Sequence, residues 1–186
     1  MLSFRQKQII YGSLLGNGCI VSTTGNPYLS ITDNNNKWLY HKASELSNIA
    51  RLNAISEDRN RLKWRSKSAT ELVQIKELCF SLNENWLEKL ADIAMAVWFI
   101  DKGYFINKNQ ICLRTSKFKN KGNLIIKKYL DSLDIWCQIK IFNPNTPRIV
   151  LTKDGTINFL KTIKPCFPQF MPMLPSQLAL SVGVLH

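Results

Sequence analysis

The chain has 186 residues, of which 45% are hydrophobic and 20% are charged, so it is long enough to bury a core and too apolar for a disordered tail. Its 25 lysine and arginine residues outnumber 13 acidic ones and give a net charge of +12, which favours a polyanionic partner. Nucleic acid is the first candidate, and a membrane surface or a merely solvated basic surface are the alternatives. No apolar run approaches the roughly 20 residues of a membrane-spanning helix, so no membrane span is expected, and the favoured partners do not include a membrane.

Hydrophobic periodicity and turn residues predict the elements of the first half. A helix ends in Gly16-Asn17-Gly18, and a later helix begins after Ser68, which has the side chain of a capping residue. In chain order, the predicted elements are helix 9–18, strands 19–21 and 28–32, helix 37–49, strand 59–65 and helix 70–82.

The second half repeats this order, beginning with the apolar stretch LADIAMAVWFIDKG at residues 90–103. This stretch is too apolar for a surface helix, so we expect it to be buried on most sides and to present Asp101 and Lys102 at its tip. Asp154 is the expected cap of the last helix, which Pro165 ends. The remaining elements are strands 104–106 and 111–115, helix 122–133, strands 139–142 and 148–151, and helix 155–163.

Two pairs of similar segments set the register of this internal repeat. YLSIT at 28–32 matches ICLRT at 111–115, and IKELCF at 75–80 matches TIKPCF at 162–167. Each half therefore reads helix, strand, strand, helix, strand, strand, helix, which predicts an α+β fold with halves at 1–85 and 86–186. The opening helices are expected to dock through their small residues, which are Gly12, Gly16, Ala91 and Ala94.

The five cysteines are scattered and form no CxxC pair, and the chain has only two histidines. A zinc site is therefore not expected, and buried, reduced thiols of an intracellular protein are the better interpretation. The many Asn, Ile and Lys residues fit an AT-rich genome, which suggests an organelle such as the mitochondrion, or a small genome.

The fragments IIYGSLLGNGCI and MAVWFIDKGYF resemble the paired motif helices of the LAGLIDADG homing endonucleases, in the single-chain branch with two repeats. The late segment LKTIKPCFPQFMPMLP is similar to the C-terminal end of that family. The resemblance implies two saddle-forming antiparallel sheets that lie in the DNA major groove. It also implies helix tips at the scissile phosphates, where an acid before each final glycine holds divalent metal.

The residues at those two acid positions are Asn17 and Lys102. An asparagine brings no charge to a Mg²⁺ ion, and a lysine ammonium has no lone pair and repels it. Asp101 lies one residue earlier, about 100° around the helix, and would need an altered helix end to replace Lys102. We therefore expect no intact catalytic residue and no cofactor, with Mg²⁺ required only if cleavage persists.

A second departure concerns the basic residues that the family places near its active centre. The family has a lysine-rich segment with proline before its second motif helix, where this chain has SLNENWLEKL. Lys164 matches the family's late lysine and is the remaining candidate for contact with a phosphate. In the internal repeat, the position of the first half that is equivalent to Lys164 is Glu77.

Basic residues on the predicted strands form the candidate nucleic-acid surface. The first set of basic residues recurs at every second position, which puts these residues on one face of the predicted strand, with Leu62 and Trp64 on the other. This set is Arg59, Arg61, Lys63 and Arg65. The second set is Arg114, Lys117, Lys119, Lys121, Lys140 and Arg148. A solvated face is the alternative interpretation of both.

Two function classes follow from these residues. In the first, the scaffold is reused to bind RNA without cutting, as an intron splicing cofactor or with other proteins in a ribonucleoprotein such as a ribosome. In the second, the protein is a degenerate homing endonuclease that binds a duplex DNA site, with or without residual cleavage. The well-patterned core beside two missing acids favours the RNA-binding class.

Overall fold

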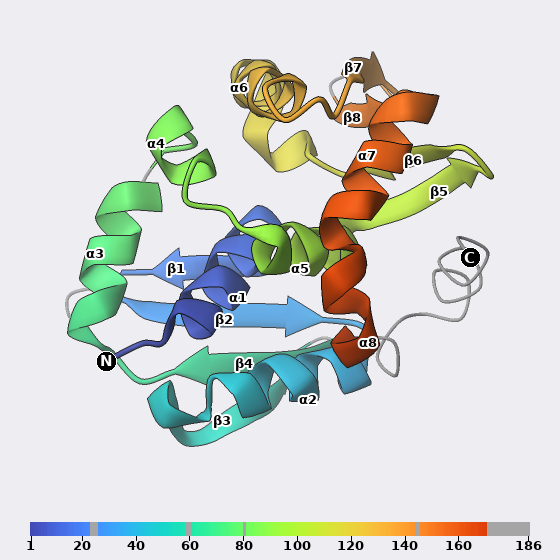
Figure 1. Cartoon of the computed structure of the whole chain (residues 1–186). Helices are drawn as coiled ribbons and strands as arrows, with labels where there is room; N and C mark the ends of the chain where they lie inside the picture. The colour runs from blue at the N-terminus through green and yellow to red at the C-terminus, as the bar shows by residue number, and fades with distance from the viewer. Residues whose placement is uncertain (23–25, 59–60, 80, 144–145, 171–186) are drawn as a thin grey trace.

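The computed structural model of the chain describes residues 1–22, 26–58, 61–79, 81–143 and 146–170. Two crossed helices, α1 (Phe4–Leu15) and α5 (Asp92–Lys102), lie at its centre between two antiparallel sheets (Figure 1). Helix α1 begins with a capping box, in which the Ser3 hydroxyl accepts from the Gln6 amide and the Gln6 side chain accepts from the Ser3 amide. In α5, every residue from Ala94 to Ile100 is buried, as its composition predicts.

The central helices approach closely because both have small residues at the crossing. A Cβ atom added to Gly12 would lie 2.4 Å from the Ala94 carbonyl oxygen, and one added to Gly16 would lie 2.2 Å from the Asp101 carboxylate. The Ala91 amide donates to the Gln8 side chain over 2.7 Å. The four small residues predicted for this interface therefore all lie in it.

The first sheet has the strand order β1-β2-β4-β3, and α2 packs on β2 and β4. Inward-facing Leu29, Ile31 and Trp64 are buried and join this sheet to the core. The strands are β1 (Gly18–Val21), β2 (Tyr28–Asp33), β3 (Ala50–Asp58) and β4 (Arg61–Ser66), and the helices are α2 (Asn36–Glu45), the 3-10 turn Ser47–Ile49, α3 (Thr70–Cys79) and α4 (Glu84–Leu87).

The second sheet repeats this order as β5-β6-β8-β7, and α6 packs on β7 and β8. The predicted α+β fold with two repeats is confirmed. Of the two similar segments, YLSIT lies within β2, and ICLRT covers the last three residues of the equivalent strand β6 and the two that follow it. The strands are β5 (Gly103–Asn107), β6 (Gln110–Leu113), β7 (Cys137–Ile141) and β8 (Pro147–Leu151), and the helices are the 3-10 turn Ser116–Phe118, α6 (Lys119–Asp131), α7 (Lys153–Ile163), the 3-10 turn Lys164–Cys166 and α8 (Phe167–Phe170).

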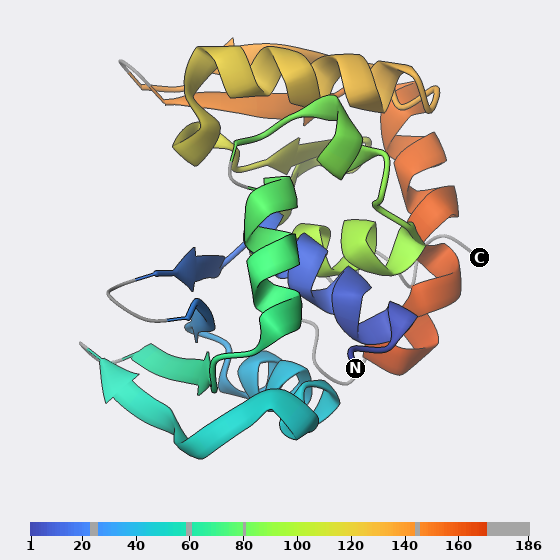
Figure 2. The same cartoon turned by 90° about the vertical axis from the view of Figure 1, so that its left-hand side faces the viewer.

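Figure 2 shows the two sheets on either side of the central helices, with the hairpins β1–β2, β3–β4 and β7–β8 extending toward one side of the molecule. This is the saddle arrangement that the family resemblance implies. Among the described residues, no helix combines the length and the hydropathy that a membrane span requires.

Two predicted helix caps are wrong. The Ser68 hydroxyl donates to the Asn26 carbonyl, two residues before α3 begins. Helix α7 begins earlier than predicted, with Thr152 as its cap, because the Thr152 hydroxyl accepts from the Gly155 amide over 3.0 Å. Asp154 then lies in the first turn, where its charge suits the helix dipole.

Candidate nucleic-acid interface and the centre between the sheets

The two positions that carry acids in the resembled family lie at the ends of the central helices. Asn17 follows α1, and its side-chain amide donates to Asp33 Oδ2 over 3.1 Å. Lys102 is the last residue of α5 and is half-buried. Burial lowers the pKa of the Lys102 ammonium, while nearby Asp101 opposes that shift and Arg114 adds to it.

Asp101 has no exposed side-chain surface, and hydrogen bonds occupy both of its carboxylate oxygens. Oδ1 accepts from Lys42 Nζ over 2.8 Å and from the Trp38 indole nitrogen over 2.6 Å. Oδ2 accepts from the backbone amide of Asn17 over 2.9 Å. The helix remains regular through Lys102, so the altered helix end that Asp101 would need in order to replace Lys102 is not present.

Lys42 joins this network to the first sheet. Its ammonium lies 2.8 Å from Asp101 Oδ1 and 3.2 Å from Asp33 Oδ2, and the side chain is fully buried. A buried ion requires such partners, because an unpaired charge away from water costs several kcal/mol. We name Lys42, Asp33 and Asp101 the central ion triad. Sequence reasoning missed this triad because lysine is almost never fully buried.

The centre does not fit a divalent cation. Lysine stands at one of the two ligand positions, Asn17 offers only a neutral amide oxygen at the other, and both carboxylates nearby pair with Lys42. Within the described ranges, no three His, Cys, Asp or Glu side chains come together as a metal site. We therefore derive no metal-dependent step at this centre.

Lys117 lies at the end of α1 and not on the sheet surface. Its ammonium donates to the carbonyl oxygens of Leu14 over 2.7 Å and Gly16 over 2.9 Å. It thereby satisfies carbonyl groups that a helix leaves without partners at its C-terminus. Burial of the ammonium, together with a smaller effect of the nearby charge of Lys102, lowers the pKa of Lys117 to about 8.

Lys164 lies away from the helix tips. It begins the 3-10 turn Lys164–Cys166, and Cys166 in that turn lies beside Asp92 and Arg5, at the beginnings of α5 and α1. Figure 2 shows this turn, after the orange-red α7, at the side opposite the hairpins. Lys164 is therefore not beside Asn17 and Lys102, and its contact with a phosphate stays a prediction. Glu77 lies exposed on α3.

The exposed face of the first sheet carries the predicted basic set. Lys63 pairs with Thr32 and Arg65 pairs with Ser30, so these residues share one face with Arg61, while Trp64 is buried on the other. The predicted alternation is confirmed for these positions. Arg59 lies outside the described residues.

The second sheet holds its arginines against aromatic rings on the equivalent face. The Arg114 guanidinium lies 5.0 Å from the centre of the Tyr104 ring, and that of Arg148 lies 4.8 Å from the centre of the Phe142 ring. Arg148 also donates to the Tyr104 hydroxyl over 2.8 Å. Lys140 is exposed and pairs directly with Arg148 across β7 and β8.

The remaining two predicted binding residues, Lys119 and Lys121, lie exposed in the first turn of α6, beyond the sheet. Within the described part of the chain, five basic residues of the two sheet faces form no ion pair with an acidic side chain. We name these residues the basic sheet surface; they are Arg61, Arg65, Arg114, Lys140 and Arg148.

A family model described as the LAGLIDADG DNA endonuclease family matches residues 7–159, which is most of the chain. The chain belongs to this family. A comparison with curated proteins found no match.

Solved structures similar to this LAGLIDADG protein agree with its fold. The homing endonuclease I-WcaI bound to its DNA recognition sequence has a TM-score of 0.77 at 17% identity, and the match covers 98% of this chain and 87% of that one. I-DmoI in complex with DNA and Mn has a TM-score of 0.58 at 14% identity, over 86% and 96%. Full-length DUF199/WhiA from Thermatoga maritima has a TM-score of 0.58 at 16% identity, over 86% and 55%.

Proposed function

We propose that this protein binds nucleic acid across its two sheets, does not cleave it, and takes structured RNA as its favoured partner. The observation that carries the proposal is the central ion triad, in which Lys42 neutralises the two carboxylates beside the missing catalytic acids. A protein that retains the two sheets of the saddle, and whose central carboxylates are paired with an internal lysine, is suited to binding nucleic acid without cleaving it.

The basic sheet surface supports the binding part of the proposal. Arg114 and Arg148 are held against aromatic rings, and neither forms an ion pair with an acidic side chain among the residues that the structure describes. Such preorganised cations lose little side-chain entropy when they contact phosphate. The net charge of +12 adds a long-range attraction for any polyanion.

The aromatic residues favour RNA. Phe142 is 41% exposed and Tyr104 lies on the same sheet face. Sequence-specific RNA recognition uses unpaired bases that stack on aromatic side chains and on guanidinium planes, which a closed DNA duplex does not offer. A splicing cofactor or a ribonucleoprotein component is the role that suits these features.

Duplex DNA is the second candidate partner, because I-WcaI and I-DmoI were solved with DNA. Fluorescence anisotropy with a structured RNA and a duplex DNA of equal length, at two salt concentrations with Mg²⁺ present, separates the two. We expect tighter RNA binding and no strand breaks on denaturing gels. Preferential binding of the duplex would favour the second candidate, and Mg²⁺-dependent cuts would overturn the proposal that the centre is inactive.

The double variant Arg114→Ala/Arg148→Ala tests the binding surface. Each lost phosphate contact reduces the slope of log K against log salt concentration by about one unit. For the double variant we therefore expect a slope about two units shallower and weaker binding to every sequence. Lys153→Ala/Lys161→Ala is the matched control, since both lysines are exposed on α7. Equal losses in the two double variants would mean that binding follows net charge and not this surface.

A further inference from the structure

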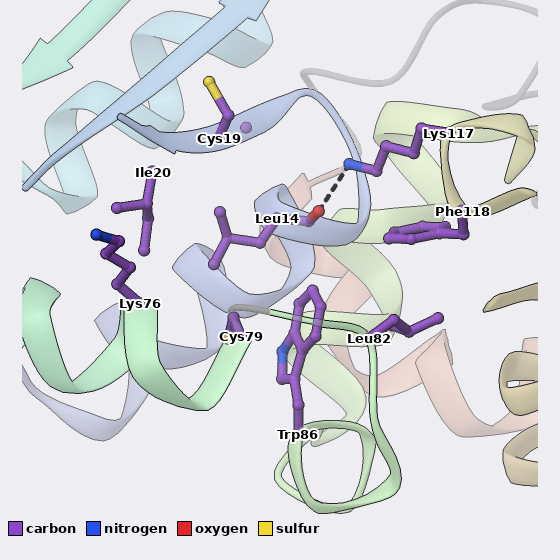
Figure 3. Close-up of a pocket in the computed structure, with 10 residues that line it drawn as sticks. Leu14, Cys19, Ile20, Lys76, Cys79, Leu82, Trp86, Lys117 and Phe118 are labelled. Carbon is purple, nitrogen blue, oxygen red and sulfur yellow. Dashed lines mark hydrogen bonds between the residues drawn. The ribbon is translucent and has the colours of Figure 1, made fainter. Parts of the chain in front are cut away.

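A cavity of about 500 Å³ lies where the two halves meet beside the end of α1. It opens between β1, α3 and the 3-10 turn Ser116–Phe118, and Figure 3 shows Trp86 standing between Lys76 on one side and Lys117 on the other. Its volume is in the range of about 300–1,000 Å³ that is typical of small-molecule sites.

The walls of the cavity are mostly apolar, from Leu14, Ile20, Leu82 and Phe118. Trp86 is only 3% exposed and forms part of the wall with its indole ring. The cavity therefore offers a place for a flat, apolar ring system.

The charges at the cavity are positive. Lys117 uses two of its three donors on the α1 carbonyls and keeps one for a ligand. Lys76 lines the opposite side, and no acidic side chain lines the cavity among the described residues. A ligand that fits both the walls and the charges combines a heteroaromatic ring with a phosphate.

The cavity is also continuous with the basic sheet surface. Cys19 is exposed at its rim on β1, and it shares a sheet face with Ser30 and Arg65. A nucleic acid on that face would therefore pass the cavity entrance.

We propose that this cavity receives a single unstacked nucleotide, with its base between the apolar walls and its phosphate on Lys76 and Lys117. The inference rests on the proposed function, because the nucleotide is expected to come from a bound strand. A free nucleotide has the same chemistry and is the other source.

The test compares a fully paired RNA duplex with the same duplex carrying one bulged adenosine. Placing one base in such a site is expected to strengthen binding by about fivefold or more. Ile20→Trp enlarges a half-buried side chain that lines the cavity, and should bring the ratio of the two affinities close to one. Lys76→Met should lower the ratio, whereas Lys161→Met, on the exposed face of α7, should leave it unchanged.

A titration with adenosine monophosphate alone, followed by protein NMR, distinguishes the source. Binding of this nucleotide to the wild type but not to Ile20→Trp supports the site even if neither RNA binds, in which case the proposed function fails and the cavity takes a free nucleotide. Equal affinity for the paired and bulged RNA, together with no nucleotide binding, would overturn the inference. A bulge preference that survives in Ile20→Trp would also overturn it.

Discussion

Lys42 is the residue on which the centre of this protein depends. Replacing it with methionine preserves most of the volume but leaves Asp33 and Asp101 as neighbouring buried carboxylates without their cation. Breaking a buried ion pair in this way costs about 3–5 kcal/mol, so we predict a loss of that size in the free energy of unfolding. Urea denaturation measures it, with exposed Lys161→Met as the control.

The triple variant Lys42→Met/Asp33→Asn/Asp101→Asn separates charge from packing. It removes all three charges together, so most of the lost stability should return if unpaired charge is the cause. A triple variant no more stable than Lys42→Met would show that the geometry of the hydrogen bonds, and not the charge, matters at this site.

The candidate site was predictable in part, and the residues show why. The absence of acids at Asn17 and Lys102 is visible in the sequence, and so is the alternation that puts Arg61 and Arg65 on one strand face. The central ion triad is not visible, because Asp101 is 59 residues from Lys42 in the chain and the two meet only when α2 packs beside the helix tips. Lys117 looks like a surface cation for the same reason: its partners are backbone carbonyls, which carry no sequence signal.

At the scale of elements, the helices and strands with strong apolar periodicity were predicted and the weakly apolar ones were not. Strand β3 (Ala50–Asp58) was missed because its residues are mostly polar and it lies at the edge of the first sheet. The single turn of α4 was missed because four residues give no periodicity. Of the segment similar to the family's C-terminal end, residues 171–175 lie outside the described residues.

The end of α1 gives a pH-dependent prediction. The pKa of Lys117 is about 8 in the folded protein and near 10.5 when unfolded, so the unfolded state binds more protons between these values. Stability therefore gains a contribution from Lys117 as pH rises from about 8 toward 10. In Lys117→Met this contribution is absent, so its urea midpoint should fall further below that of the wild type at pH 9.5 than at pH 7.5. A constant difference would show that Lys117 titrates in the folded protein as it does in the unfolded chain.

At the scale of the whole molecule, the two halves share one core because α1 and α5 cross without side chains between them at Gly12. The Cβ atom of an alanine there would lie 2.4 Å from the Ala94 carbonyl oxygen and 2.7 Å from Val97 Cβ, both on the rigid core of α5. Neither neighbour is the end of a flexible side chain, so the helices themselves must separate. Overpacking of this kind typically costs about 1–3 kcal/mol.

We therefore predict that Gly12→Ala lowers the urea midpoint and, because it separates the sheets, weakens binding of nucleic acids that contact both of them. Ser44→Ala is the control, since Ser44 is exposed on α2, far from the crossing. Gly12→Ala should change little the affinity for an oligonucleotide that is short enough to contact only one sheet. The binding residues within each sheet keep their positions relative to one another in this variant. If long and short ligands lose affinity equally, the crossing supports folding but does not set the spacing of the two halves of the interface.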